Sequence, residues 1–387
     1  MAALTSTSVT PTTLTSRASN AAATAHVRRA PWIALGIALW AAVTWLVGLR
    51  QGLLFAVGIG YGAVLAAVSF GFTTGWRAWI RDRDPTGLLA QFLAIALAMV
   101  IGIPLIAGDE ALSGAIAPLS VSLVLGAFVF GAVMQIADGC GSGTLYKAGL
   151  GNVFSLAVLP GFIAGSFLGA AHLDAWLALG SLEPVALPEK IGVAGTLALQ
   201  LALLGGLAAW LWSRRKATDT RWKGRGIYVA AICMALFAVL NLVIAGQPWG
   251  IVYGLGLWGA KVATWLGMDL TANAFWGRPA QQAHITSTLL TDVTSITNLG
   301  LLFGAFVAAH WRGTDCQAVK ASGRQWLAGI VSGLLLGYSS RLAFGCNVGG
   351  YFSGISTGSL HGWVWFAAAF AGSLAGVRLR AALGFKA

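Results

Sequence analysis

Two cysteines of this chain stand in glycine-rich turns, Cys140 within residues 139–143 and Cys346 within residues 345–350. Each glycine costs a helix about 1 kcal/mol relative to alanine, so we expect both turns to be unwound. New helices then begin near Thr144 and near Gly350, and the free N–H groups at a helix N-terminus favour an anion. The two thiols and these backbone amides are therefore candidates for an anion-binding site.

The two turns are copies of one pattern. Five residues recur 206 positions later, and each copy follows an apolar helix: Gly131, Ala137, Gly139, Cys140 and Gly143 match Gly337, Ala343, Gly345, Cys346 and Gly349. Loop charges give the stretches 87–107 and 296–309 opposite directions, which predicts an inverted repeat with broken helices at the midplane. Unwound backbone at membrane depth is tolerated where it lines a cavity. We therefore expect the turns to border a polar path.

The elements that must position these turns are membrane helices. Of 387 residues, 57% are hydrophobic and only 9% are charged, against roughly 25% in a soluble domain. Eleven apolar runs approach the length that crosses a bilayer: 31–49, 52–73, 87–107, 121–137, 153–172, 191–212, 227–245, 250–266, 296–309, 326–342 and 362–379. We expect an all-α polytopic membrane protein with about 10–12 transmembrane or re-entrant helices and no separate soluble domain.

The chain divides into a tail and one membrane domain. Residues 1–30 are rich in Ser, Thr and Ala and contain no acid, which predicts a disordered cytoplasmic tail; an organellar transit peptide has a similar composition. Residues 31–387 form a single transmembrane domain, with repeat halves at about 31–173 and 250–380 linked by extra helices in 191–245. One more crossing or a re-entrant hairpin is needed after Gly250, and the segment 271–290 is the candidate.

Basic loop residues predict the orientation, because Lys and Arg favour the cytoplasmic side. They gather in the first residues, in three loops and at the C-terminus: Arg28, Arg29, Arg77, Arg81, Arg83, Arg214, Arg215, Lys216, Arg221, Lys223, Arg225, Arg312, Lys320, Arg324, Arg378, Arg380 and Lys386. Acidic residues mark the opposite face: Asp109, Glu110, Asp174 and Glu183. Both termini are therefore predicted to be cytoplasmic. The formal charge of +12 is spread between apolar runs rather than clustered on one soluble surface, which excludes nucleic acid as a partner.

Charges within or beside the apolar runs are further candidates, since charges inside a membrane are costly and usually functional. Arg341 lies one turn before Cys346, and its repeat mate is Gln135. Lys147 either faces an anion or reaches to the headgroups, and Lys261 adds a third positive charge. Asp138 either pairs with Lys147 or Arg341 or caps the unwound turn.

The other two cysteines have simpler interpretations. Cys233 stands alone in an apolar helix and is interpreted as a small hydrophobic residue. Cys316 lies in a polar loop and is interpreted as an exposed thiol. We expect a structural role for His361.

Three stretches together resemble a known family. Residues 341–356 (RLAFGCNVGGYFSGIS), continuing through 359–363 (SLHGW), are similar to the signature of the YeeE/YedE family of inner-membrane sulfur transporters. Residues 138–146 (DGCGSGTLY) resemble its earlier cysteine motif, and residues 70–77 (FGFTTGWR) resemble a third motif. The resemblance covers most of the chain from about Gly52 onward. This sequence departs at Gly71, a position often occupied by cysteine.

The resemblance implies a protein of the bacterial inner membrane that imports thiosulfate or a related inorganic sulfur anion, without a cofactor or catalytic residues. Thiosulfate has a soft terminal sulfur and hard oxygens, so S–H and backbone N–H groups can contact its two ends. Conduction needs weak contacts that release the ion, which favours transient binding by neutral thiols. The predicted substrate-binding residues are Cys140, Cys346, Gly139, Gly141, Gly143, Gly345, Asn347, Gly349, Arg341 and Lys147.

Two alternatives remain open. In the first, Cys140 or Cys346 carries a persulfide to a cytoplasmic sulfurtransferase. In the second, the transported substrate is a selenium oxyanion or a soft metal ion. A metal path would show paired ligands, whereas His284, His310 and His361 lie far from matching positions. An enzyme would place a base beside a thiol, and no such base is evident.

Overall fold

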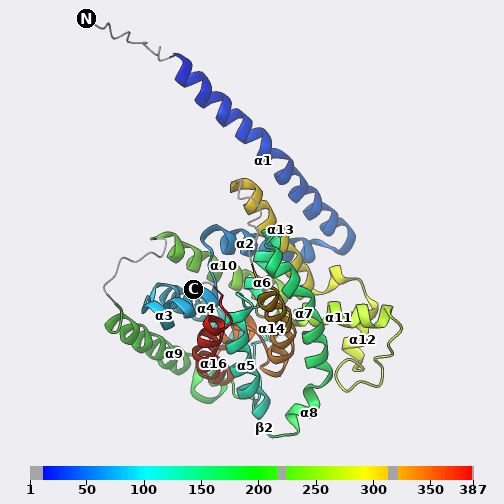
Figure 1. Ribbon diagram of the computed structural model, residues 1–387. Coiled ribbons are helices and arrows are strands. Elements are labelled where there is room, and N and C mark those ends of the chain that lie inside the picture. Colours follow the sequence, from blue (N-terminus) through cyan, green and yellow to red (C-terminus); the bar gives the residue numbers. More distant parts are fainter. Residues whose placement is uncertain (1–11, 217–223, 313–320, 386–387) are drawn as a thin grey trace, which may run out of the picture.

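The computed structural model describes residues 12–216, 224–312 and 321–385, and its regular structure is almost entirely helical (Figure 1). The first part of the chain forms α1 (Thr12–Val47), α2 (Leu49–Val68), α3 (Phe72–Asp82), α4 (Thr86–Gly108), α5 (Val121–Ile136), α6 (Gly141–Gly149), α7 (Val153–Ala171), α8 (Leu173–Leu177) and α9 (Leu187–Ser213). The second part forms α10 (Gly226–Ala245), α11 (Val252–Trp265), α12 (Pro279–Thr286), η1 (Leu289–Thr291), α13 (Val293–Arg312), α14 (Gly323–Leu342), η2 (Asn347–Ser353), α15 (Gly354–Ser356) and α16 (Leu360–Ala382). Two short strands, β1 (Leu119–Ser120) and β2 (Ser181–Leu182), pair antiparallel.

Ten segments of the described chain are long and apolar enough to cross a membrane, which confirms an all-α polytopic membrane protein. They are Ala30–Val47, Leu49–Asp82, Thr86–Gly108, Val121–Gly149, Val153–Ala171, Leu187–Ser213, Gly226–Ala245, Val293–Trp311, Gly323–Ser356 and Leu360–Ala382. Large apolar side chains on their outer faces are exposed, as a lipid environment requires. Figure 1 shows α1 extending away from the packed helices.

The halves of the repeat exchange their packing partners. The helix before the first turn, α5, packs against α16 of the second half, and the equivalent α14 packs against α7 of the first half. In the same way α2 packs against α13, and α10 packs against α4. Reciprocal pairs of this kind are what a pseudo-two-fold axis between two halves produces. We propose that the second half begins with α10 rather than at residue 250, and that α1 and α9 flank the repeat.

Glycines allow the exchanged helices to approach closely. A Cβ at Gly131 on α5 would collide with the carbonyl of Ala369 on α16. Its repeat mate, Gly337 on α14, lies in the same way against the carbonyl of Phe162 on α7. Small residues at helix crossings are the usual means of tight packing in membranes. The repeated residues therefore include the glycines at which the two halves pack against each other, as well as the thiol turns.

One predicted span has a different structure. The run 250–266 forms α11, which has 14 residues and is too short to cross a bilayer. Gly246 accepts a hydrogen bond from Ser113 in the loop after α4, whereas Ile251 lies beside Cys346 at the core. The chain therefore enters the protein and returns through α11. This is the re-entrant piece, and assigning it to 271–290 was wrong, since that segment holds only the eight-residue α12, the start of η1 and turns. The first part of the run, from Val252 to Ala260, is apolar because it is largely buried among helices, whereas Val262, Trp265 and Leu266 are exposed.

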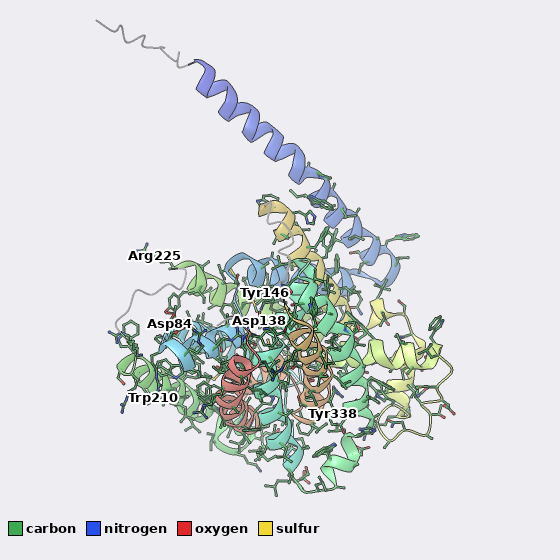
Figure 2. All side chains as sticks on the ribbon, viewed as in Figure 1. Asp84, Asp138, Tyr146, Trp210, Arg225 and Tyr338 are labelled. Atoms are coloured by element: carbon green, nitrogen blue, oxygen red, sulfur yellow. The ribbon has the colours of Figure 1, made fainter. Side chains whose placement is uncertain are left out.

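The tail and the two ends of the molecule complete the fold. Residues 1–11 of the predicted tail lie outside the described residues, and the backbone of α1 begins at Thr12. We name the end that carries Arg81, Arg225 and Arg380 the basic end, and the end formed by the loops 109–120 and 172–186 the acidic end. Figure 2 shows Asp84, Asp138 and Arg225 toward the basic end and Tyr338 toward the acidic end.

Candidate functional site

The two thiol turns have the same backbone conformation. Asp138 and Phe344, which are repeat mates, are both left-handed with φ of 58°. The cysteines that follow them are extended, with φ and ψ of −85° and −165° at Cys140 and −82° and −168° at Cys346. Gly345 has φ of 154° and lies too close to Gly350 for any Cβ to fit. The prediction that both helices break at these turns is confirmed. Each cysteine immediately precedes a new helix.

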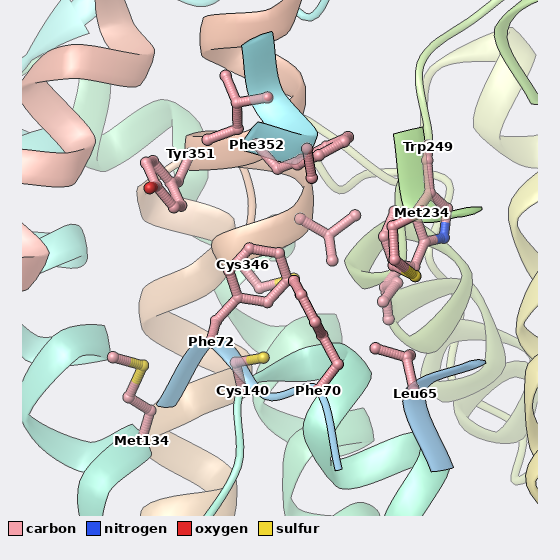
Figure 3. Close-up of a cluster of buried hydrophobic side chains, with 14 of the residues drawn as sticks. Leu65, Phe70, Phe72, Met134, Cys140, Met234, Trp249, Cys346, Tyr351 and Phe352 are labelled. Carbon is pink, nitrogen blue, oxygen red and sulfur yellow. The ribbon is translucent and has the colours of Figure 1, made fainter. Parts of the chain in front are cut away.

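The two thiols meet at one place in the core. Both are fully buried, and Figure 3 shows them close to Phe70 and Phe72. A Cβ on Gly141, the first residue of α6, would stand 2.8 Å from Cys346 Sγ, so the start of a helix from the other half lies against this thiol. Cys140 and Cys346 themselves immediately precede α6 and η2, so both thiols lie at helix starts, where amides are free and the helix dipole is positive. The second of these helices, η2, is π-helical, a form often found at functional sites.

Two more helices begin beside the thiols. The start of α3 at Phe72 and the start of α11 at Val252 come from opposite halves. An aromatic residue and a glycine precede α3 directly, and the same pair precedes α11 with Ile251 in between. Asn298 on α13 donates to the carbonyl of Ile251 at 2.9 Å, which fixes the start of α11. Gln91 on α4 takes the matching place beside α3, where it accepts a hydrogen bond from Trp76 at 2.9 Å. Four helix starts thus converge on the thiols.

Polar side chains near these helix starts lack partners. Within the described chain, the hydroxyls of Thr73 and Thr144 and both amide atoms of Asn347 are buried without a hydrogen bond. Thr73 is on α3, Thr144 is in the first turn of α6, and Asn347 follows Cys346. A buried polar atom without a partner is costly, and at a functional site a bound ligand or water commonly satisfies it. These atoms add hydrogen-bonding capacity to the amides around the thiols.

A charged cluster lies at the basic end of the thiol turns. Asp138 pairs with Arg77 at 2.7 Å, with Lys147 at 2.6 Å and with Arg380 at 3.4 Å. Gln135 supports the cluster, since its side chain accepts from Arg77 Nε at 3.0 Å and its carbonyl accepts from Arg380 at 2.8 Å. One carboxylate thus faces three cations, which leaves a positive excess. Of the predicted partners of Asp138, Lys147 is confirmed and Arg341 is wrong, because Arg341 lies toward the acidic end.

The remaining predicted residues fall outside this core. Arg341 lies with its guanidinium carbon 5.0 Å from the ring centre of Phe275 and 5.9 Å from that of Tyr253. Lys261 donates to the carbonyls of Ile285 and Ser287 and so supports the end of α12 rather than the thiols. Cys233 is half-buried on α10, and Cys316 lies outside the described residues.

Comparisons with known proteins agree with this geometry. A family described as Sulphur transport matches residues 67–375, which is most of the chain. The chain belongs to this family. The match starts just before α3 and ends within α16, so all four helix starts around the thiols lie inside it.

Curated relatives carry more specific names. The chain is 25% identical over 323 residues to a protein of Spirochaeta thermophila named thiosulfate transporter TsuA, covering 80% of this chain and 92% of that protein. It is 28% identical over 149 residues to proteins named probable transporter YedE from Salmonella typhimurium and Escherichia coli, covering 38% of this chain and 36% of each relative. The chain thus spans about a third of the length of these two relatives.

Several residues of the site were not identified from the sequence. The partners Arg77 and Arg380 were interpreted only as loop charges, although Arg77 stands in the third motif. The start of α11 carries its own signal, since Trp249-Gly250 followed by Gly254 repeats Phe70-Gly71 followed by Gly75. The two copies of this second pattern are separated by fewer residues than the two cysteine turns are. For Arg380 the sequence contains no local signal.

Proposed function

We propose that this protein imports thiosulfate or a related inorganic sulfur anion through a path lined by Cys140 and Cys346. The observation that carries the proposal is the position of Cys346, which immediately precedes η2 and whose Sγ lies against the start of α6 from the other half. Soft sulfur can contact the thiols while hard oxygens accept from N–H groups of Gly141, Val348 and Gly349. The name of the Spirochaeta relative supports thiosulfate as the anion.

The contacts in this proposal are transient. A neutral thiol donates weakly, so an anion bound to it can leave, whereas a fixed ammonium would hold it longer. Of the other predicted residues, Gly143, Asn347 and Gly349 lie in the first turns of α6 and η2, and Gly139 and Gly345 lie in the turns just before them. Lys147 belongs to the Asp138 cluster, through which the anion leaves, and Arg341 belongs to the acidic end, through which it arrives.

The orientation follows from the basic end. Lys and Arg near helix ends favour the cytoplasm, so we place the basic end and both termini there, in a bacterial inner membrane. The Asp138 cluster is then the cytoplasmic exit. A cytoplasmic sulfurtransferase is required only by the alternative in which a cysteine carries a persulfide.

Reconstituted uptake tests the proposal. Proteoliposomes with purified protein should accumulate labelled thiosulfate faster than sulfate, and Cys140→Ala and Cys346→Ala should abolish this uptake. Cys233→Ala, on the outer helix α10, is the matched control and should transport normally. Equal rates for the two anions, or normal uptake by both alanine variants, would remove the role of the thiols. Mass spectrometry after exposure to thiosulfate should show unmodified Cys140; a stable gain of one sulfur would favour the persulfide relay.

A further inference from the structure

A cavity of about 260 Å³ lies at the acidic end of the molecule. It is lined by Arg341 and Phe344 from the end of α14, by His361 at the start of α16, by Leu173 and by residues 114–117 of the loop after α4. Among the residues that the structure describes, no thiol and no carboxylate lines it. Phe344 is two residues before Cys346, so the cavity adjoins the second thiol turn but is separate from it.

Arg341 brings an unneutralised positive charge to this cavity. In the part of the chain that the structure describes, its guanidinium forms none of the ion pairs, and its Nε is buried without a hydrogen bond. The rings of Phe275 and Tyr253 hold the group by cation–π contact. Such contacts fix the position of the cation but leave its N–H donors for another acceptor. An unpaired cation in this setting is costly unless a ligand uses it.

His361 supplies a second donor. Its side chain is 1% exposed, and its Nδ1 lies 2.6 Å from the hydroxyl of Ser359. Its Nε2 has no partner within the described residues. When Ser359 donates to Nδ1, the proton of the neutral ring is on Nε2, which is then a donor. A guanidinium and an imidazole N–H together suit the oxygens of an anion and make no use of a soft sulfur atom.

We propose that this cavity is a capture site for tetrahedral oxyanions, which selects for charge and oxygen before the thiols select for sulfur. The proposal rests on the proposed function for its place in the path. The site exists in one half only, because the repeat mates of Arg341 and Phe344 are Gln135 and Asp138. Sulfate has the charge and oxygens of thiosulfate but no terminal sulfur. It therefore binds here, competes with thiosulfate and is not passed on.

Direct binding of sulfate tests this site. Tryptophan fluorescence or calorimetry on purified protein should detect sulfate binding to the native protein and, with similar affinity, to Cys346→Ser. Arg341→Gln should weaken this binding by about tenfold or more, because a charged donor is lost. Arg341→Lys should keep part of the affinity. Arg278→Gln is the matched control, since Arg278 lies at the same end, is half-exposed and pairs with Asp174 instead.

A second variant guards against misfolding of Arg341→Gln. Leu173→Glu leaves Arg341 in place but adds a carboxylate to the cavity, and it should also abolish sulfate binding. Absence of sulfate binding by the native protein, or binding that survives both variants, would overturn the proposal. Failure of the proposed function has a different signature: thiosulfate uptake would be absent, while sulfate binding would still depend on Arg341.

Discussion

Gly141 of one half lies directly against Cys346 of the other: a Cβ at position 141 would stand 2.8 Å from Sγ. Gly141→Ala therefore displaces the thiol from the amides that surround it. We expect thiosulfate uptake to fall at least about fivefold, since overpacking costs about 1–3 kcal/mol. Initial rates in proteoliposomes measure the effect. Gly205→Ala on α9, where no atom lies within 4 Å of the added carbon, is the control. Normal uptake by Gly141→Ala would contradict a role for this contact.

The carboxylate of Asp138 offsets part of the charge of three cations at the basic end. Asp138→Asn keeps the shape of the side chain but leaves Arg77, Lys147 and Arg380 with a larger positive excess. We expect the anion to be held longer at the exit, so both the KM and the maximal rate of uptake should fall. Removing one cation, in Asp138→Asn with Arg380→Gln, should restore part of the rate. A higher KM or an unchanged maximal rate in the single variant would argue against this role.

Asn298 positions the start of α11 through its bond to the carbonyl of Ile251. Asn298→Ala removes the shorter of two hydrogen bonds to this carbonyl and leaves it only the 3.4 Å bond from the Leu255 N–H; losing one hydrogen bond costs about 0.5–1.5 kcal/mol. We expect a lower unfolding temperature and slower uptake, because Ile251 packs beside the thiol turns. Thermal unfolding in detergent and uptake are measured on the same preparation. Thr264→Ala, later on α11, is the control for a general effect on this helix. An Asn298→Ala protein as stable and active as the native one would show that this bond does not fix the helix start.

The repeat mates Gly131 and Gly337 predict matched losses of stability. An added methyl group would meet a carbonyl of the partner helix at either position, and overpacking costs about 1–3 kcal/mol. Gly131→Ala and Gly337→Ala should therefore lower the unfolding temperature by similar amounts. Gly206→Ala, which has no atom near the added carbon, should leave it unchanged. A large effect at only one of the two glycines would count against equivalent roles in the two halves.

The sequence predicted the parts of this molecule that depend on local chemistry. Glycine costs a helix stability wherever it occurs, so the breaks at Cys140 and Cys346 follow from composition alone. The apolar runs predicted the helical membrane fold in a similar way, because the length and apolar composition of a run are also local properties of the sequence. The repeat could be recognised because both copies keep alanine, glycine and cysteine at matching positions around the turn, although the left-handed residue itself is Asp138 in one copy and Phe344 in the other.

The residues that were missed depend on contacts between distant segments. Arg380 is 242 residues from Asp138, and no local pattern links them. The run 250–266 resembles a lipid-facing helix because burial in protein and burial in lipid select the same apolar residues. His361 was given a structural role, and its bond to Ser359 agrees with that; its second ring nitrogen could be recognised as unpaired only once its neighbours were placed.

The exchanged packing of α5 with α16 and α14 with α7 has an evolutionary consequence. Neither half encloses its own broken helix, so a half-length ancestor would have needed a second copy of itself, inserted upside down, to cover that surface. Fusion of two such copies in one chain frees them to differ, and here Arg341 and Phe344 of one copy stand where the other has Gln135 and Asp138. A symmetric dimer has no such freedom, since every substitution changes both mouths at once.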